Sequence, residues 1–443
     1  MFRAVARIFR TPDLRRKIGF TLGIVALFRL GSFIPAPFVD FGNIQACLAG
    51  SAGTSGLYEL VNLFSGGALL KLSVFALGIM PYITASIIVQ LLRVVIPHFD
   101  TLYKEGQTGQ AKLTQYTRYL TIALGVLQST TLITVARSGA LFSSGGTSGA
   151  PECSALITDD AWYAIMLMVI TMTAGTGLIM WMGELITERG IGNGMSLLIF
   201  TSIAATFPGA LWTIGQAKGP EVLVMVIAVG IVIMALVVFV EQSQRRIPVQ
   251  YAKRMVGRRT YGGNNTYIPI KVNMAGVVPV IFASSLLYLP ALIAQFNQPA
   301  PGAEPAGWVT WITNYLTKGD HPLYMLLYFL LIVGFTYFYV AITFNPEEVA
   351  DNMKKYGGFI PGIRAGRPTA EYLDYVLTRV TLPGSLYLGL IALIPLAALA
   401  LVQANGNFPF GGASILIIVG VGLETVKQID SQLQQRHYEG LLR

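Results

Sequence analysis

Residues 222–246 read VLVMVIAVGIVIMALVVFVEQSQRR, an uninterrupted apolar run followed closely by two arginines. A helix needs about 20 mainly apolar residues to cross the hydrocarbon core of a bilayer. The run has that length and contains no charged side chain before Glu241. The stretch therefore predicts a membrane-spanning helix over about 220–240, with Arg245 and Arg246 just outside the membrane.

The same test applied outward along the chain gives ten candidate spans. They are predicted at about 18–35, 74–96, 119–138, 161–181, 193–213, 220–240, 274–295, 322–343, 378–402 and 411–427. An even number of crossings places both ends of the chain on one side. Ten spans divide into five and five, which suggests two halves related as an inverted-topology repeat.

Composition agrees with a bilayer as the solvent. Hydrophobic residues make up 53% of the 443 residues and charged residues only 12%. A soluble domain usually carries about a quarter charged residues. The net charge of +9 comes largely from loops on one side of the spans, so it does not by itself indicate nucleic-acid binding.

Positive charge is distributed unequally between the two sides of the predicted spans. One set of connections holds nearly all lysines and arginines, and the opposite set has only Lys71, Arg137, Lys218 and Lys318. Loops rich in Lys and Arg stay in the cytoplasm. We therefore expect a multi-span membrane protein with a cytoplasmic N-terminus (1–17), a first half (18–213), a second half (214–427) with cytoplasmic loops 241–273 and 344–377, and a cytoplasmic tail (428–443).

The chain has two cysteines, Cys47 and Cys153, and both fall in loops predicted to lie outside the cytoplasm. A disulfide is allowed in that compartment. Two unpaired cysteines are the alternative, and the sequence favours that alternative.

Patterns that would indicate catalysis are missing from the sequence. It has no Walker pattern, no HExxH pair and no nucleophile elbow. The spans also hold almost no acidic residue near their middles, although such residues usually mark ion coupling. Arg29 is the charged exception, and we expect it to snorkel or to pair with a carbonyl. The sequence thus favours a passive conduit without cofactor or metal, whose energy comes from a partner.

Residues 62–92 contain two unusual features. The segment 62–71, NLFSGGALLK, is apolar but too short to cross a membrane, and Gly66-Gly67 makes it flexible. From composition alone it is best interpreted as an amphipathic loop at the interface, and a fold back into the bundle is the alternative. Beyond it, Gly78 and Pro81 predict a kink in the second span.

Eight motifs, in order over nearly the whole chain, carry a family resemblance. They are FRLGSFIPAP (28–37), NLFSGGALL with FALGIMPYITASIIVQLL (62–92), QYTRY (115–119), ITERGIGNG (186–194), YAKR (251–254), KVNMAG (271–276), FNPEEVADN (344–352) and FIPGIR (359–364). Together they resemble the bacterial SecY family, which forms the central subunit of the protein-conducting Sec translocon. The resemblance implies an all-α membrane fold of ten helices around an hourglass pore, with a short re-entrant plug helix.

The resemblance also implies two parts of a seal. A ring of aliphatic side chains would form the narrowest point of the pore: Ile79, Ile83, Met195, Ile199, Ile281 and Ile417. Met195 departs from the isoleucine that is common in the family, and its flexible thioether would seal more softly. The plug would block the outer funnel at rest, with Phe64, Ser65, Gly66, Gly67, Ala68, Leu69 and Leu70.

Two further surfaces are implied. A lateral gate, where spans two and three meet spans seven and eight, would release hydrophobic segments into lipid. Its polar candidates are Ser86, Gln90, Gln128, Thr130, Asn273, Ser284 and Ser285, and ordinary packing between helices explains each of them equally well. Basic loop tips at Arg258, Arg259 and Arg364 would dock the motor ATPase SecA and the ribosome, including its RNA phosphates.

The partners implied by the resemblance are SecE-like and SecG-like subunits, SecA, the ribosome, signal sequences and nascent chains, membrane lipid and a YidC-like insertase. The alternative function is a secondary transporter for a small solute. A transporter should hold polar or ionisable ligands at mid-membrane and does not need large basic cytoplasmic loops. An intramembrane enzyme is a third possibility and lacks any catalytic constellation.

Overall fold

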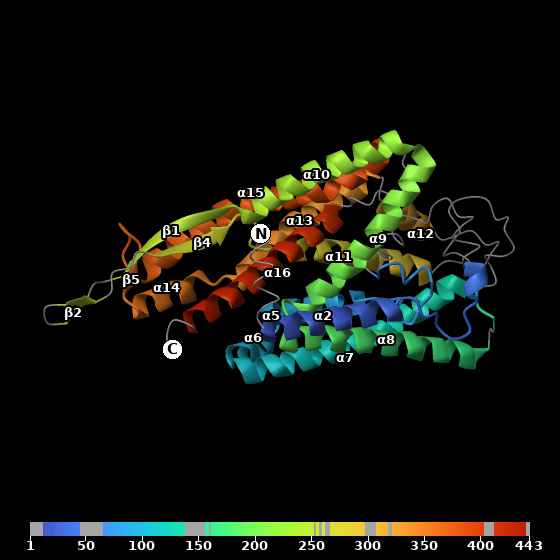
Figure 1. The fold of residues 1–443 in the computed structure, drawn as a ribbon, viewed down its shortest axis with the longest axis horizontal. Helices are drawn as coiled ribbons and strands as arrows, with labels where there is room; N and C mark the ends of the chain where they lie inside the picture. Colours follow the sequence, from blue (N-terminus) through green and yellow to red (C-terminus); the bar gives the residue numbers. More distant parts are fainter. Residues whose placement is uncertain are drawn as a thin grey trace.

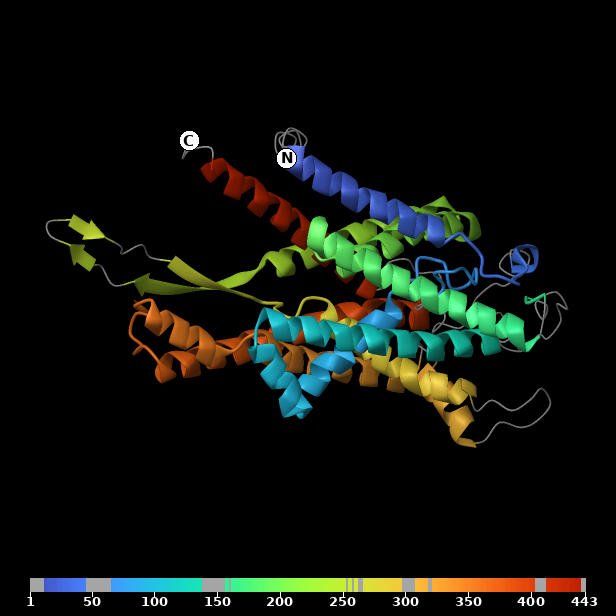
Figure 2. The ribbon, with the colours of Figure 1, turned by 90° about the horizontal axis from the view of Figure 1, so that it is seen from below.

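The computed structural model describes residues 12–44, 65–137, 156–158, 161–251, 254–256, 259–261, 266–296, 307–317, 321–402 and 412–439. The described chain is mainly helical, and its long helices run along the longest axis of the molecule (Figure 1). Figures 1 and 2 show that the two ends of this helical body differ from each other. One end carries a β-hairpin, and α2 begins and α16 ends on that same side.

The first half of the chain is built around α8. Its helices are α2 (Pro12–Gly31), α5 (Met80–Val95), α6 (Pro97–Lys104), α7 (Gln107–Arg137), α8 (Trp162–Arg189) and α9 (Gly194–Lys218). Helix α8 contacts α2, α5, α7 and α9. The second half contains α10 (Pro220–Gln242), α11 (Val278–Phe296), α12 (Gly307–Ile312), a π-helical turn (Thr313–Thr317), α13 (Pro322–Thr343), α14 (Pro346–Lys355), α15 (Arg367–Val402) and α16 (Gly412–Glu439).

Helix starts follow local sequence rules. Proline occupies the first turn of α5, α6, α10, α13 and α14, where its missing N–H leaves no hydrogen bond unmade. Asn193 caps α9 by accepting from the Met195 amide at 3.1 Å, and Asn345 caps α14 by accepting from the Glu347 amide at 3.1 Å. These caps fix the points at which the chain leaves a loop and enters a helix.

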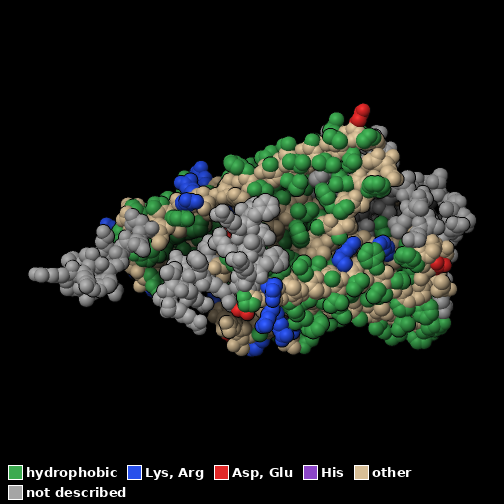
Figure 3. Space-filling view, in the orientation of Figure 1, with side chains coloured by type: hydrophobic (Ala, Val, Ile, Leu, Met, Phe, Trp, Pro, Cys, Tyr) green, Lys and Arg blue, Asp and Glu red, His purple; other side chains and the backbone are tan. Residues whose placement is uncertain are grey.

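Each of the ten predicted spans overlaps one helix. Among the described residues, six helices have the length and hydropathy of a complete span, and α5 with α6, bent by 102°, would make a seventh. Figure 3 shows hydrophobic side chains gathered over α10 and over α7 and α8, as lipid-facing helices require. The count of ten crossings therefore stays a prediction, while the multi-span helical character is confirmed.

Some helix ends differ from the predicted span ends. Span two, predicted from 74, begins only at Met80, because Gly78 has φ +56° and Pro81 starts a helix instead of kinking one. Helix α15 already begins at Arg367, inside the predicted loop 344–377. Helix α16 continues to Glu439 through the predicted tail.

The predicted cytoplasmic loops add strands to a helical fold. Strand β1 (Gln244–Tyr251) pairs antiparallel with β4 (Thr266–Lys271), in the register Arg246↔Pro269 and Pro248↔Tyr267. Strand β2 (Arg254–Val256) pairs with β3 (Arg259–Tyr261) further out. The short β5 (Gly358–Phe359) pairs with the end of β1, so the two loops form one sheet of order β4-β1-β5.

This sheet is anchored by its own apolar core. Ile247, Val249 and Ile270 from the sheet are buried together with Met353 of α14 and Leu373 of α15. The alternating burial along β1 turns these side chains inward and leaves the arginines outside. The described parts of the two basic loops thus form one unit joined to the helical body.

We predict that Leu373→Ala loosens this unit. Leu373 is fully buried, and removing such a side chain costs about 2–5 kcal/mol. Limited proteolysis of the purified protein should cut within 241–273 faster than in the wild type. Tyr356→Ala is the matched control, because Tyr356 is 78% exposed. Equal cleavage rates for both variants would contradict the shared core.

Candidate functional site

The six predicted ring residues meet in one apolar cluster. Ile79, Ile199, Ile281 and Ile417 are buried members of this cluster, and Ile83 and Met195 are partly buried against it. We call it the central cluster. The remaining buried members are Ile24 and Phe28 from α2, Phe75 before α5 and Met80 at its start, Ile179, Met182 and Ile186 from α8, Leu198 and Ile203 from α9, and Val421 from α16.

Four helices from both halves of the chain deliver the six side chains. Ile79 directly precedes α5, and its carbonyl accepts from the Ile83 amide at 3.1 Å, so both lie on one face. Met195 and Ile199 come from the first turns of α9, Ile281 from α11 and Ile417 from α16. All six are uncharged and carry no hydrogen-bonding group except the weak thioether acceptor of Met195.

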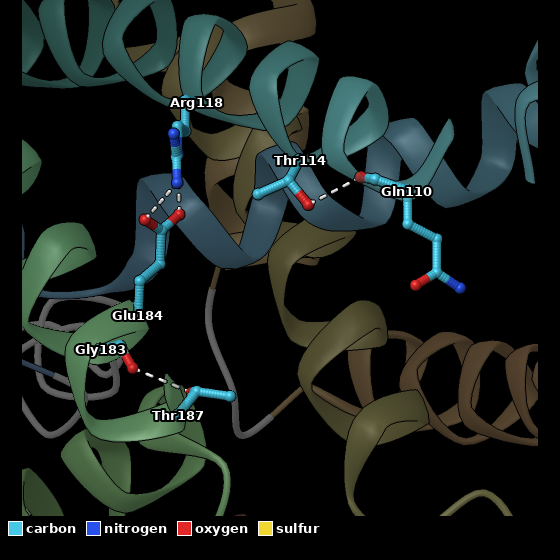
Figure 4. A network of polar contacts seen from close by, with 6 residues as sticks. All are labelled: Gln110, Thr114, Arg118, Gly183, Glu184 and Thr187. Atoms are coloured by element: carbon cyan, nitrogen blue, oxygen red, sulfur yellow. Dashed lines mark hydrogen bonds and ion pairs between the residues drawn. The ribbon is translucent and has the colours of Figure 1, made fainter. Parts of the chain in front are cut away.

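The turn between α8 and α9 positions Met195. The Thr187 hydroxyl donates to the Gly183 carbonyl at 3.0 Å (Figure 4). It also accepts from the Gly194 amide at 2.9 Å. The Met195 thioether lies directly over Gly183, where a Cβ would collide with the sulfur. Gly194 likewise lies against the Gly183 carbonyl. Glycine at these two positions lets α9 approach α8 closely.

The described plug residues differ from the expected helix. Residues 65–79 form a succession of turns, because Gly66 and Gly67 have φ of +69° and +84° and interrupt helical geometry. Ser65, Ala68 and Leu69 are buried, and Leu70 and Gly67 are partly buried. Phe64 lies outside the described residues. The described part of the segment packs within the bundle, as the fold-back alternative predicted, and not as the interfacial loop that composition alone favoured.

The plug joins a second apolar cluster. Leu69 and Leu72 are buried with Ile133 of α7 and with Met168 and Met172 of α8. Arg29 in the last turn of α2 donates from Nη1 to the Gly66 carbonyl at 2.9 Å, which confirms the expected pairing with a carbonyl. The plug thus lies between the first-half helices, beside the central cluster.

The predicted gate residues of the first half lie on α5 and α7. Ser86 and Gln90 lie on α5, with Gln90 Nε2 3.5 Å from Ser86 Oγ. Gln128 is partly buried on α7, and Thr130 bonds its own helix at Val126 O. Helix α11 contacts both α5 and α7, so the expected seam exists as a contact.

On the second half, the gate candidates are held within their own half. Asn273 donates to Glu241 at the end of α10 at 2.6 Å and to the Gly276 carbonyl at 3.2 Å. Ser284 bonds the Ile281 carbonyl of its own helix, and Ser285 is buried in α11. Asn273 therefore anchors the start of α11 and is not placed at the seam by these bonds.

Sequence reasoning missed a cavity at this seam. A pocket of about 370 Å³ lies between α5, α7 and α13. Two predicted gate residues, Ser86 and Gln90, line it, and Arg93, Tyr103, Thr117 and Tyr339 complete much of its wall. Its walls come from both halves, and only the tertiary structure brings these positions together.

A second missed feature is an ion pair between α7 and α8. Arg118 donates from Nε and Nη2 to the two carboxylate oxygens of Glu184, at 2.9 and 2.6 Å (Figure 4). Such a bidentate pair fixes geometry as well as charge. Arg118 belongs to the QYTRY motif, but no local signal in the sequence points to a partner 66 positions away.

The predicted docking arginines are only partly described. Arg364 is exposed, and its carbonyl accepts from the Thr369 hydroxyl at 2.8 Å after a turn at Gly362 with φ +85°. Arg259 lies in β3, and nothing is described of its side chain. Arg258, Cys47 and Cys153 lie outside the described residues. Among the described residues, no group of His, Cys, Asp and Glu could hold a metal ion.

Comparisons with known proteins identify the family. A family model described as SecY matches residues 73–426. The chain belongs to the SecY family. Over the full length of both chains it is 65% identical to the protein translocase subunit SecY of Streptomyces scabiei, 66% identical to that of Streptomyces coelicolor and 60% identical to that of Micrococcus luteus.

Solved structures share the fold. One described as a protein-conducting channel matches with a TM-score of 0.62 at 19% identity, covering 93% of this chain and 91% of that chain. Another concerns the SecY plug domain, which in that protein stabilises the closed state and maintains a membrane seal, with a TM-score of 0.61 at 19% identity and the same coverage. The resemblance from motifs and the channel fold class are confirmed.

We predict that Gly194→Ala disturbs the α8–α9 turn. The added Cβ would collide with the Gly183 carbonyl, a backbone atom that cannot move alone. The thermal midpoint in detergent should fall. Gly177→Ala on α8 is the control, because a Cβ there meets nothing within 4 Å and alanine favours a helix by about 0.5–1 kcal/mol. A Gly194→Ala midpoint equal to that of the wild type would count against this packing.

Proposed function

We propose that this chain is the channel subunit of a bacterial protein translocase. It would move unfolded preproteins across the plasma membrane and release hydrophobic segments sideways into lipid. The observation that carries this proposal is the convergence of six side chains from four helices of both halves in the central cluster. Full-length identity of 65% to a protein translocase subunit SecY supports it. The alternative of a small-solute transporter finds no support in this family membership.

The central cluster explains how such a channel could stay sealed without a charged filter. An apolar constriction excludes water and ions by dewetting. Aliphatic side chains offer no fixed hydrogen bonds that a passing polypeptide would have to match. They can move apart around a chain of any sequence and close again afterwards. Non-selective passage and a tight resting state thus follow from the same side chains.

The plug adds a second barrier on the outer side. Ser65, Ala68 and Leu69 are buried, so the segment fills space within the first half. It has few helical hydrogen bonds to break when it moves, because it consists of turns. A segment of this kind can leave as a unit when a translocating chain takes its place.

A lateral gate would open between α5 with α7 and α11 with α13. Hydrogen bonds between helices in membranes contribute on average only about 0.6 kcal/mol each. The gate candidates Gln90, Thr130 and Ser284 bond within their own helices, so few such bonds would have to break. The cavity of about 370 Å³ gives an entering hydrophobic signal segment a starting point at this seam.

Energy and targeting would come from partners. The sheet β4-β1-β5 presents basic residues such as Arg245 and Arg246 on a rigid support, and Arg364 follows β5 in an exposed turn. Guanidinium groups suit both carboxylates and RNA phosphates. A solved Sec61 structure belongs to a ribosome-channel complex. We infer docking of the ribosome and of SecA here, SecE-like and SecG-like subunits against the helices, and a YidC-like insertase as a further partner.

Orientation completes the proposal. The start of α2 and the end of α16 lie on the side of the basic sheet (Figure 2). By the positive-inside rule, this side would be cytoplasmic. The chain would itself carry out no catalysis, since its role is to form the path.

We predict that Ile281→Ser makes the resting channel leak ions. A hydroxyl in the central cluster gives water a hydrogen-bonding partner and weakens dewetting. Conductance of the reconstituted complex in planar bilayers, without substrate, should rise above that of the wild type. The control is Leu286→Ser on the same helix, where the side chain is 43% exposed. Unchanged conductance in Ile281→Ser would remove this residue from the seal.

We also predict that Arg364→Glu abolishes motor-driven export while the fold is kept, because Arg364 is exposed. The measurement is protection of a preprotein from protease in proteoliposomes supplied with SecA and ATP. Arg367→Glu makes the same charge change three residues away, at a side chain that is 90% exposed. Export that is normal in the first variant, or equally lost in both, would contradict a specific role for Arg364.

A further inference from the structure

The two ends of the described plug segment are held by different kinds of bond. At its C-terminal end, the backbone pairs with residues 34–36: the Ala36 amide donates to the Leu72 carbonyl at 3.0 Å, and the Val74 amide donates to the Ile34 carbonyl at 2.9 Å. These bonds do not depend on side-chain identity. They make this end a fixed point of attachment to the chain that follows α2.

At the other end, a side chain of the bundle makes a polar contact with the plug. Arg29 Nη1 donates to the Gly66 carbonyl at 2.9 Å across 37 positions of sequence. Gly66 has φ +69°, and a Cβ there would lie 3.0 Å from Arg29 Nη1 and 3.2 Å from the Ser202 Cα of α9. Glycine at this position therefore lets the carbonyl face the guanidinium while the backbone lies flat against α9.

The surroundings of Arg29 make this bond the main attraction between its charge and the plug. Arg29 is partly buried, and its guanidinium lies 5.3 Å from the centre of the Phe33 ring. Lys71 Nζ lies 4.2 Å from the same ring. The carboxylates of Asp100, Glu184 and Glu371 pair with other cations, namely Arg93, Lys104, Arg118 and Arg367.

Electrostatics between the two cations oppose the closed position. Burial, and then the nearby Arg29 charge, lower the pKa of the Lys71 ammonium, which lies outside the membrane spans. The plug thus carries a positive charge that Arg29 repels. The hydrogen bond to Gly66 has to overcome that repulsion for the segment to stay in place.

We propose that Arg29 is a positioning residue that latches the plug, so that opening breaks the Arg29–Gly66 bond while the pairing at residues 72–74 stays as the hinge. This inference rests on the proposed sealing function of the plug. A charge-assisted bond is strong enough to favour the closed position, and one such bond is weak enough to be broken by an arriving polypeptide.

The test measures exposure of the plug directly. In the complete complex, with Cys47 and Cys153 replaced by serine, Ala68→Cys places a thiol at a fully buried position. A membrane-impermeant thiol reagent added from the outer side should modify it slowly. Adding Arg29→Leu should speed the modification about tenfold, which is the scale of losing one hydrogen bond to a charged group. Arg29→Lys should give an intermediate rate, because it keeps a charged donor.

Phe33→Leu is the matched control. It removes the ring that both cations contact but leaves the Arg29–Gly66 bond possible, so its modification rate should stay near that of the parent. Thermal midpoints of all variants show whether the fold is kept. A modification rate in Arg29→Leu equal to that of the parent, or a Phe33→Leu rate raised to the same extent, would overturn the latch.

Ion conductance of the substrate-free complex separates this inference from the proposed function. A variant lacking residues 65–71 should leak, and Arg29→Leu should leak less than the deletion. If the deletion leaks and Arg29→Leu matches the parent in both assays, the latch is refuted and the sealing role of the plug stands. If the deletion itself does not leak, the sealing role fails, and the latch fails with it.

Discussion

Exclusion of water from the central cluster is the constraint on which the rest of the structure depends. The cluster draws apolar side chains from α2, α5, α8, α9, α11 and α16, and none of the six predicted ring positions bears a charge. Apolar contact is non-directional, so the cluster can hold two halves together and still allow them to separate. A polar ring would have needed matched partners and would have closed in only one arrangement.

Close backbone approach makes this cluster possible. Gly183 and Gly194 bring α8 and α9 together, and Thr187 satisfies the first amide of α9 across the turn. The bidentate Arg118–Glu184 pair joins α7 to α8. The first half is thus internally braced, whereas α5 and α7 share a cavity with α13 of the second half, and the described gate candidates Gln90, Thr130 and Ser284 bond within their own helices. This contrast in bonding favours separation between the halves over distortion within one of them.

The sheet β4-β1-β5 likewise joins distant parts of the chain, on the side where partners would dock. Two loops are joined through β1 and β5, whose paired residues Tyr251 and Gly358 are 107 positions apart in the chain, and both rest on α14 and α15. Force applied to either loop would therefore reach the start of α15 and α11 through a buried core. Asn273, held by Glu241, ties the first residues before α11 to the end of α10.

The sequence by itself determined the class of the molecule and where most of its apolar helices lie, whereas the six ring positions were predicted from the family resemblance alone. Long apolar runs and one-sided charge suffice for this, because bilayer thickness and charge exclusion act on local composition. Motifs in order along the chain predicted the family, and Arg29 was expected to find a carbonyl. The sequence did not predict that the plug consists of turns or that α5 starts only at Met80. Both follow from the local backbone geometry of glycine and proline.

Only the tertiary structure decided which distant groups meet. The convergence of Ile79 and Ile417, the Arg118–Glu184 pair, the Arg29–Gly66 bond and the cavity between α5, α7 and α13 all join positions far apart in sequence. The sheet that unites the two loops is of the same kind. Hydropathy reports how deep a residue lies in the membrane, but it carries no information on rotation about a helix axis or on which helices are neighbours. Side-chain packing fixes both, and packing exists only in the folded chain.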